Sequence, residues 1–498
     1  MVLYRTKGIA SRYKTGPRLD TYRNRTKKTT STGDFGPSLA DTTRCGLGVA
    51  DRCWNEYRRG LRQPCRERHT HLTNVTCGAT LLAMCIREPH IIYLALLSLS
   101  LVSALDNGVG LLPPLGYNTW NDLGRKLSSS ALRARVDAMV SSGLVAAGYT
   151  YFNLDDGWAS DSRGADGRLL ADPAKFPEGM ANFSRYVHSH GLKLGLYTDR
   201  GTKTCLGKPG SYGYEKVDAQ QYAEWEIDYL KEDNCKAPGG ANNHTEAHAR
   251  FAMMRDALNS TGRRIFFSVC GGGDQLPLGN LSYYAHPPFG SALANSWRIS
   301  ADATEWLTTL HALGIDGELA QYASAGAYND PDMLLSSTHG AVRKLGTQQS
   351  RTQFSIWAIL AAPMLIGGPI SSLSSWDMYT FTNSEVLAVS QDALVSQGTK
   401  IAPGIWARLL HTGSVAVVMA NDAFYTRAIT CDAACWSHMP SAHGPCTIHG
   451  PCHFTVRDLW LHEPPIQSWM RHLVAGQEFS ISMPGYWSSF MFKLTPVP

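Results

Sequence analysis

Eight short runs rich in β-forming residues alternate with longer helical stretches in the central part of this chain, and no other feature constrains the fold as strongly. Helical segments such as 129–146 and 219–227 separate successive runs. Parallel strands are joined by crossover helices of this kind, and eight β/α units can close a barrel. The sequence therefore predicts an α/β fold, a (β/α)8 TIM barrel. Its strands are expected at 115–120, 151–155, 192–198, 229–233, 264–270, 295–299, 325–329 and 363–367.

Polar and acidic side chains stand at the ends of these expected strands, which surround the active-site cleft of a β/α barrel. The strand-ending residues are Trp120, Asp155, Asp156, Tyr197, Asp199, Lys231, Glu232, Asp233, Cys270, Arg298, Asp302, Asp330 and Asp332. A single aspartate there is about as often only a helix cap, but a ring of them exceeds what folding needs. Carboxylates accept hydrogen bonds from several hydroxyls and an aromatic ring stacks on a sugar face, so the pattern favours a carbohydrate substrate. Two carboxylates can then divide glycoside cleavage between a nucleophile and an acid/base.

Seven motifs, in order and at natural spacing, resemble the α-galactosidase (melibiase) family of retaining glycoside hydrolases. They are LDNGVGLLPPLGYNTWNDL, YFNLDDGW, HGLKLGLYTDRGTKTC, YLKEDNC, NSWRISAD, YNDPDML and FSIWAILAAPMLIGG. The resemblance covers essentially the whole chain from Leu105 onward. It implies a barrel followed by an antiparallel β-sandwich domain. It also implies hydrolysis of terminal non-reducing α-D-galactosyl residues by a double displacement, without a metal or an organic cofactor.

The same resemblance implies roles for individual residues. The motif YLKEDNC makes Asp233 the nucleophile, with Lys231 binding hydroxyls, and NSWRISAD makes Asp302 the acid/base, with Arg298 contacting the sugar. The pair Asp155–Asp156 resembles the clamp on the C4 and C6 hydroxyls that selects galactose. Further positions of the pocket wall are Trp120, Tyr197, Cys205, Cys270, Asp332 and Met333.

The two proposed catalytic carboxyl groups need unequal proton affinities. Retention requires them to lie about 5 to 5.5 Å apart. Lys231 is expected to keep Asp233 ionised, whereas burial and the neighbouring negative charge are expected to keep a proton on Asp302. Because side chains alternate along a strand, Lys231 and Asp233 should both point into the cleft.

The cysteines of the barrel and two departures from the family pattern raise further expectations. The resemblance implies a disulfide between Cys205 and Cys235, and it leaves Cys270 as a free thiol. Gly271–Gly273 stand where the family places residues near the sugar's C2 substituent, so specificity at C2 is open. Glu232 replaces an aromatic residue and should face the helix layer, where it either pairs with a base or reaches solvent.

The sequence from 396 to 498 reads as a small antiparallel β domain without a clear helix, after a barrel domain at 105–395. Four cysteines lie in it, at Cys431, Cys435, Cys446 and Cys452. Two disulfides with three alternative connectivities are expected, in preference to a zinc site.

The residues before the barrel differ in character. The chain has 46 Lys and Arg, and 16 of them lie in 1–83. Of its 41 Asp and Glu, only 6 lie there, so 30 basic and 35 acidic residues remain in the rest of the chain. We interpret 1–83 as a basic segment that does not fold, either a leader or an upstream start, with an RNA-binding arm or a transit peptide as the alternatives. The stretch 84–104 has the parts of a signal peptide, and its twelve apolar residues at 91–102 rise only about 18 Å, too short for a membrane span of roughly 30 Å.

A signal peptide predicts entry into the secretory pathway, with the extracellular space or the vacuole or lysosome as destination. Four Asn-x-Ser/Thr sequons agree with this, at Asn182, Asn243, Asn259 and Asn280. The expected partner is an α-galactoside oligosaccharide or glycoconjugate. No nucleic acid and no stable membrane anchor are expected, and the assembly is left open between a monomer and a homodimer.

Three alternative functions are compatible with these motifs. Two belong to the same family, α-N-acetylgalactosaminidase and β-L-arabinopyranosidase. Asp155 and Asp156 argue against the latter, because a pentose has no C6 hydroxyl to bind. The third is a sugar-binding pseudoenzyme, which the presence of both Asp233 and Asp302 disfavours.

Overall fold

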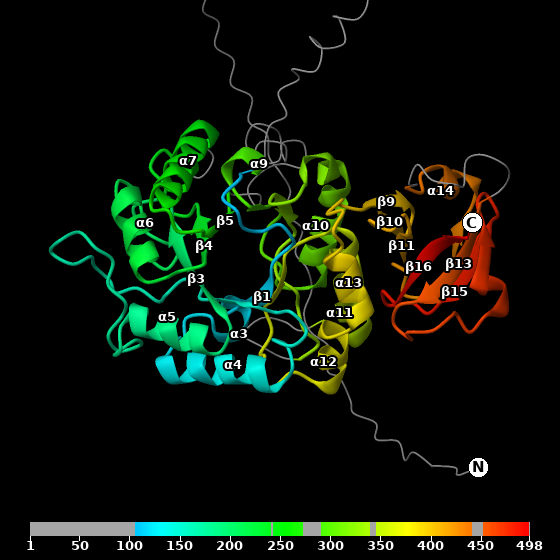
Figure 1. The fold of residues 1–498 in the computed structure, drawn as a ribbon, viewed down its shortest axis with the longest axis horizontal. Helices are drawn as coiled ribbons and strands as arrows, with labels where there is room; N and C mark the ends of the chain where they lie inside the picture. Colours follow the sequence, from blue (N-terminus) through cyan, green and yellow to red (C-terminus); the bar gives the residue numbers. More distant parts are fainter. Residues whose placement is uncertain (1–104, 241–242, 272–289, 339–344, 441–451, 498) are drawn as a thin grey trace, which may run out of the picture. The chain divides into compact units, whose positions relative to one another are not determined.

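The computed structural model describes residues 105–497 with gaps at 241–242, 272–289, 339–344 and 441–451 (Figure 1). The expected segments 1–83 and 84–104 lie outside the described residues, as do Asn280 and Cys446. In the part of the chain that is described, no helix combines the length and apolarity needed to cross a membrane.

Eight parallel strands form the first sheet and confirm the predicted barrel. In space they follow the order β7-β6-β5-β4-β3-β2-β1-β8, so nearly every strand lies beside its neighbour in sequence. Leu334 closes the ring, since it forms a parallel bridge with Ile366 of β8 after the chain leaves β7. The strands are β1 Leu115–Asn118, β2 Tyr151–Asn153, β3 Lys193–Asp199, β4 Tyr229–Asp233, β5 Phe266–Val269, β6 Ser296–Arg298, β7 Tyr328–Asp330 and β8 Met364–Ile366.

Helices follow the strands as crossover connections. The expected helix at 129–146 is shorter than predicted, because α4 ends at Ser141 and Gly143 then takes a left-handed φ of 89°. It begins where the Ser128 hydroxyl accepts a hydrogen bond from the Ala131 amide. The helices of the barrel are α3 Trp120–Leu123, α4 Ser129–Ser141, α5 Met180–Ser189, α6 Glu215–Glu224, α7 His244–Ser260, α9 Gly290–Leu293, α10 Trp306–Leu319, η1 Ala320–Tyr322, α11 Thr347–Ile359, α12 Ser375–Phe381 and α13 Ser384–Ser390.

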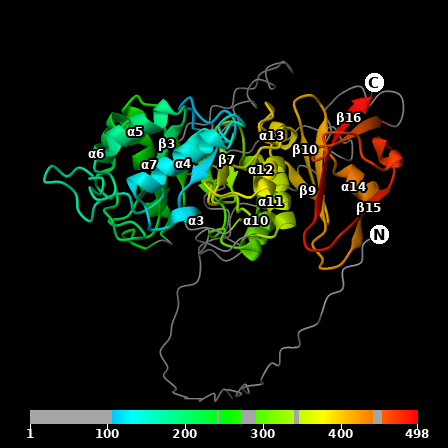
Figure 2. The same cartoon turned by 90° about the horizontal axis from the view of Figure 1, so that it is seen from below.

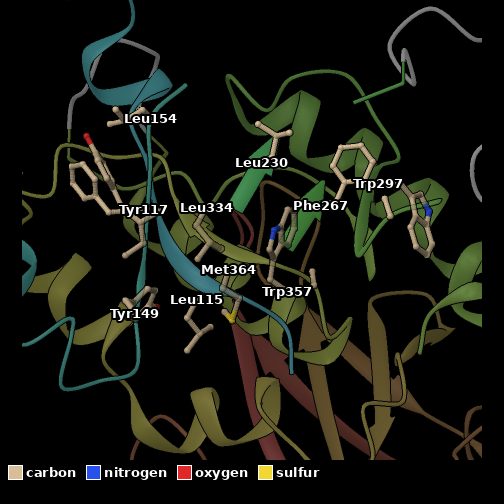
Figure 3. Close-up of a cluster of buried hydrophobic side chains, with 14 of the residues drawn as sticks. Leu115, Tyr117, Tyr149, Leu154, Leu230, Phe267, Trp297, Leu334, Trp357 and Met364 are labelled. Carbon is tan, nitrogen blue, oxygen red and sulfur yellow. The ribbon is translucent and has the colours of Figure 1, made fainter. Parts of the chain in front are cut away.

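Two apolar clusters hold the barrel strands in place. The inner cluster fills the barrel with Tyr151, Tyr229, Phe266, Tyr328, Met333, Leu365 and Val395. In it the rings of Tyr229 and Phe266 stack with centroids 4.9 Å apart. The outer cluster joins the strands to the helices, and Figure 3 shows Leu230 of β4 and Trp357 of α11 among its buried side chains. Because successive strand residues alternate between the two clusters, the strand ends are held from both sides.

The C-terminal region contains the predicted antiparallel β domain. A six-stranded sheet has the order β14-β13-β16-β11-β10-β9, and a two-stranded sheet pairs β12 with β15. The strands are β9 Thr399–Ala402, β10 Ile405–Leu409, β11 Val415–Ala420, β12 Arg427–Cys431, β13 His453–Asp458, β14 His472–Val474, β15 Phe479–Met483 and β16 Ser489–Val497. A disulfide joins Cys431 to Cys435. Contrary to the expectation of no helix, α14 covers Ala433–Ser437 and the 3₁₀ helix η3 covers Ser468–Arg471.

The central strands β10 and β11 of the six-stranded sheet are buried on both faces. Val417 and Met419 of β11 pack toward the two-stranded sheet, whereas Ala416 and Val418 belong to the large cluster that includes the barrel helices. Helices α11 and α13 lie between the barrel strands and this sheet in both views (Figure 1, Figure 2). A strand buried on both sides explains the uninterrupted apolar sequence of β11.

A buried arginine crosses this junction. Arg408 of β10 is 0% exposed, and its Nη1 donates to the backbone oxygens of Ala358 and Val389, each at 2.7 Å. These oxygens belong to the last turns of α11 and α13, where helix carbonyls lack partners and the helix dipole is negative. Burial lowers the pKa of Arg408 to about 10, so it stays charged at neutral pH.

Candidate active site

The strand-ending residues meet at one end of the barrel. Asp233 is the last residue of β4, Arg298 ends β6, and Asp155 lies two residues after β2. On β4, Leu230 points into the outer cluster and Tyr229 into the inner one. The alternation of side chains therefore directs Lys231 and Asp233 into the barrel mouth, as predicted.

The Asp233 carboxylate is held at both oxygens. Tyr197 Oη donates to its Oδ2 at 2.8 Å, and the Asn234 amide donates to its Oδ1 at 2.8 Å. Burial raises the pKa of Asp233 above its ordinary value, although Lys231 and the Tyr197 hydroxyl act in the opposite direction. Burial and the charge of Asp233 raise the pKa of Tyr197 as well, which keeps this hydroxyl a donor. The carboxylate is thus oriented by fixed donors.

Lys231 links this carboxylate to the end of β2. Its Nζ lies 3.0 Å from Asp155 Oδ2, which also accepts a hydrogen bond of 3.0 Å from Asn118 Nδ2. Burial lowers the pKa of Lys231, but Asp155 and Asp233 outweigh this and raise it well above its ordinary value. Beside them, Asp156 Oδ2 accepts from the Leu206 amide at 2.8 Å. Asp155 and Asp156 are each less than 5% exposed and present fixed acceptors at the cleft.

Asp302 has a different environment. It lies on the loop between β6 and α10, its side chain is 65% exposed, and Arg298 Nη2 contacts its Oδ1 at 3.2 Å. Burial raises the pKa of Asp302, but Arg298 and then Lys231 lower it more, so its pKa lies below the ordinary value. The expectation that Asp302 holds a proton through burial is wrong for this structure. The reason is that the guanidinium of Arg298 points at it.

Arg298 also fixes the segment after β7. Its Nη1 lies 3.2 Å from Asp332 Oδ1, and Asp332 Oδ2 accepts from the Ala303 amide at 2.6 Å. Asp332 has a positive φ of 79°, which is strained for a residue with a side chain. The Asp332 amide donates to Asp330 Oδ1 at 2.8 Å. Burial raises the pKa of Asp330 to about 6. These contacts tie the loop that carries Asp302 to a strained turn.

The remaining predicted wall residues lie around this centre. Trp120 begins α3 rather than ending β1, because the Asn118 side chain accepts a hydrogen bond of 2.9 Å from its amide and turns the chain. Trp120 packs against the inner cluster that contains Met333. Cys270 is a free thiol, as predicted, and its Sγ lies 4.0 Å from Arg298 Nη1. The Gly271–Gly273 question stays open, because 272–289 are outside the described residues.

A small cavity lies beneath these residues, with a volume of about 20 Å³. Its lining includes Asn118, Lys231, Arg298, Asp330, Asp332 and Met333. This volume admits one water-sized group. Charged side chains line this cavity together with apolar ones such as Met333 and Leu365.

The predicted disulfide between Cys205 and Cys235 is present beside Asp233. Asp199, in register with Asp233, accepts from the Cys235 amide at 2.7 Å, and burial followed by the charge of Asp233 raises its pKa to about 7. Oxygen and sulfur atoms of these four residues lie within 4.8 Å of one another. Sulfurs joined in a disulfide carry no thiolate for a metal ion, so this cluster is a support for the Asp233 loop.

Glu232 departs from both alternatives foreseen for it. It faces the helix layer, is 0% exposed, and neither carboxyl oxygen has a hydrogen-bond partner within the described part of the chain. Burial, with added repulsion from Asp199 and Glu215, raises its pKa well above the ordinary value, and Arg200 offsets this only in part. Glu232 is therefore a buried acid whose protonated form is favoured by its surroundings, neither paired nor exposed.

Two residues of the centre were missed from the sequence. Asn118 orients Asp155, and its position at the end of β1 was the available signal. Asn234 contributes only its backbone amide to Asp233, and a backbone donor leaves no trace in the residue type.

Comparison with known proteins agrees with this geometry. The sequence model of a family described as "Alpha galactosidase A" matches residues 120–392. The α-galactosidase of Cyamopsis tetragonoloba is 36% identical over 397 residues, which cover 78% of this chain and 88% of that protein. The chain belongs to the α-galactosidase family. The Coffea arabica α-galactosidase is 39% identical over 368 residues, covering 72% of this chain and 89% of its own. Among solved α-galactosidase structures, enzyme I from Mortierella vinacea has a TM-score of 0.68 at 29% identity and covers 78% of this chain and 98% of its own.

Membership of this glycosidase family accounts for the shared architecture. The Mortierella vinacea structure is similar over more than the barrel, because the match covers 78% of this chain and the barrel alone is shorter than that. The chain is therefore a glycosidase with a barrel and an antiparallel β domain.

Proposed function

We propose that the protein hydrolyses terminal α-galactosyl residues of oligosaccharides or glycoconjugates with retention of configuration. The observation that carries the proposal is the pair of unlike carboxyl groups at the barrel mouth. Asp233 is held between a tyrosine hydroxyl and a backbone amide, and Asp302 stands exposed beside Arg298. The names of the relatives support galactose as the sugar.

In the first step Asp233 attacks the anomeric carbon and Asp302 gives its proton to the glycosidic oxygen. The carbon–oxygen bond to the leaving group breaks, and a covalent glycosyl ester forms on Asp233. A bound sugar covers the exposed carboxyl of Asp302, and this desolvation raises its pKa against the effect of Arg298. The substrate itself thus helps to load the proton.

In the second step Asp302 takes a proton from water, which attacks the ester and releases the sugar. Once Asp233 is esterified its negative charge is gone, so the pKa of Asp302 falls and it becomes a base. Two inversions at one carbon restore the original configuration.

Galactose specificity is assigned to the acceptors after β2. Asp155 is fixed by Asn118 and Lys231, and Asp156 by the Leu206 amide. Rigid acceptors of this kind distinguish an axial from an equatorial C4 hydroxyl and require a C6 hydroxyl. A pentopyranoside would leave one of these buried carboxylates without its partner.

A secretory location is proposed on independent grounds. Disulfides such as Cys205–Cys235 and Cys431–Cys435, both within the described residues, form in oxidising compartments. The asparagines of the described sequons, Asn182, Asn243 and Asn259, are all exposed.

The test compares the full chain with Asp233→Asn and with Asp161→Asn, an exposed control whose side chain is 94% accessible. Substrates are the chromogenic α-galactoside, α-N-acetylgalactosaminide and β-L-arabinopyranoside. We expect turnover of the galactoside, a loss of at least about a thousandfold in Asp233→Asn, and normal activity in the control. Proton NMR should show the α-anomer as the first product. Turnover that survives Asp233→Asn, or a first product of inverted configuration, would refute the mechanism.

A further inference from the structure

Three large aromatic side chains stand exposed together on the β domain. Phe424, Tyr425 and Tyr486 are 76%, 69% and 67% exposed, and the rings of Phe424 and Tyr486 meet edge to face with centroids 5.9 Å apart. We call these three residues the aromatic shelf. Exposing so much aromatic surface is unfavourable in water, so a grouped set indicates a binding surface.

Strand pairing brings the shelf together from distant parts of the chain. Ala420 of β11 pairs with Ser489 of β16, and Arg427 of β12 pairs with Met483 of β15. The loops at 421–426 and 484–488 therefore leave the two sheets side by side.

The two loops are fixed to one another by buried polar contacts. Asn421 is 0% exposed, and its Nδ2 lies 2.9 Å from the backbone oxygens of Tyr425, Met483 and Pro484. The Tyr486 amide donates to the Ala423 oxygen at 2.8 Å. The shelf is thus presented on a rigid frame rather than on loose loops.

The backbone at the shelf also carries strain. Tyr486 and Trp487 are consecutive aromatic residues with positive φ angles of 59° and 62°. Such conformations are unfavourable for residues with a side chain, and they are found mainly where function demands them. At the preceding position, a Cβ on Gly485 would lie 2.4 Å from the Phe424 carbonyl carbon, so the approach of the loops requires glycine.

The shelf is continuous with the end of the barrel that carries the active site. The Trp487 ring lies 4.9 Å from that of Trp306, and Thr352 Oγ1 donates to the Trp487 oxygen at 2.6 Å. Trp306 begins α10 four residues after Asp302, and Thr352 lies in the first half of α11. Helices in a β/α barrel begin at the carboxyl ends of the strands, so both anchors lie toward the cleft.

The chemistry of the shelf suits sugar rings. Flat aromatic faces stack on the C–H faces of pyranoses, and phenol groups add hydrogen bonds. Three rings offer roughly 400 Å², about half of what one partner buries in a stable protein interface, but enough for two or three sugar units. We propose that Phe424, Tyr425 and Tyr486 bind the sugar chain of the substrate beyond the galactosyl unit, which makes branched polysaccharides or long oligosaccharides the preferred substrates.

This inference rests on the proposed function. Its test is the ratio of kcat/KM on a polysaccharide to kcat/KM on a small substrate. For the full chain, kcat/KM is measured on galactomannan and on the chromogenic α-galactoside. The variants are Phe424→Ala and Tyr486→Asn, since asparagine tolerates the left-handed backbone. Each lost ring should lower the galactomannan-to-chromogenic ratio about two- to tenfold, mainly through KM. Trp469→Ala, which removes a 49% exposed ring elsewhere in the same domain, is the control and should leave the ratio unchanged.

Direct binding separates failure of the shelf from failure of the proposed function. Galactomannan is titrated into the full chain carrying Asp233→Asn, with and without Phe424→Leu, which keeps apolar bulk but loses the flat ring. Loss of binding with Phe424→Leu supports the shelf even if the wild type hydrolyses no galactoside. An unchanged ratio, an equal loss on both substrates, or retained binding overturns the inference. The inference is also overturned if Phe424→Leu weakens self-association of the chain but leaves galactomannan binding unchanged. The aromatic shelf would then be a contact between copies of the chain.

Discussion

The buried acid at position 232 gives the sharpest prediction about stability. Glu232 is fully buried between the β4 strand and the helix layer, with both oxygens unpartnered and its pKa raised well above the ordinary value by burial. In the unfolded chain its pKa is about 4.3. Between that value and the native pKa, the unfolded state loses a proton that the native state keeps, so stability falls as the pH rises.

The size of this effect follows from one proton. Each pH unit in that window costs about 1.4 kcal/mol, so Glu232 lowers the free energy of unfolding by at most about 2.7 kcal/mol between pH 5 and pH 7. Glu232→Gln removes the titration but keeps an unpartnered polar group. Glu232→Met has an unbranched side chain of similar length and also removes the unpartnered polar group. This removal should add about 1 to 3 kcal/mol to the free energy of unfolding.

The assay is urea unfolding of the wild type and both variants at pH 5 and pH 7. We expect the wild type to lose stability relative to Glu232→Gln as the pH rises, and Glu232→Met to be the most stable at pH 7. Other groups titrate equally in all three proteins, so the difference isolates position 232. Parallel pH profiles for the wild type and Glu232→Gln would show that Glu232 is ionised or paired, and the reasoning would fail.

Three further predictions concern the active site. Tyr197→Phe removes the 2.8 Å hydrogen bond to Asp233 and should lower kcat/KM about tenfold on the chromogenic galactoside, and an unchanged value would contradict its role. Asp302→Asn should lower kcat about 10²- to 10⁴-fold on galactosides with sugar leaving groups. The loss should be smaller on a nitrophenyl galactoside, because its leaving group needs no proton. Equal losses of kcat on both substrates would argue against proton donation by Asp302. The double variant Cys205→Ser/Cys235→Ser should lower the free energy of unfolding by about 3.5 kcal/mol, since the bridge spans 30 residues, and urea midpoints measure this.

The parts of the fold that depend on local periodicity were predictable from the sequence. Eight β/α units imply a closed barrel, and alternation along β4 alone places Lys231 and Asp233 at its mouth. Contacts that depend on side-chain orientation were not. The pKa of Asp302 depends on where the Arg298 guanidinium points, and the isolation of Glu232 depends on which helix residues come near it.

The aromatic shelf illustrates a third limit. Phe424 and Tyr486 look like scattered surface residues in the sequence, and only the pairing of β11 with β16 and of β12 with β15 makes them neighbours. Long-range strand pairing of this kind carries no local signal.

The buried guanidinium of Arg408 has a consequence for how this enzyme could be shortened. Deleting everything after the barrel would expose the carbonyl ends of two of its helices and the apolar side of α11 at once, without leaving any substitute donor. The minimal catalytic fragment therefore includes the second domain, and a stop codon in that domain should abolish soluble expression rather than merely shorten the product.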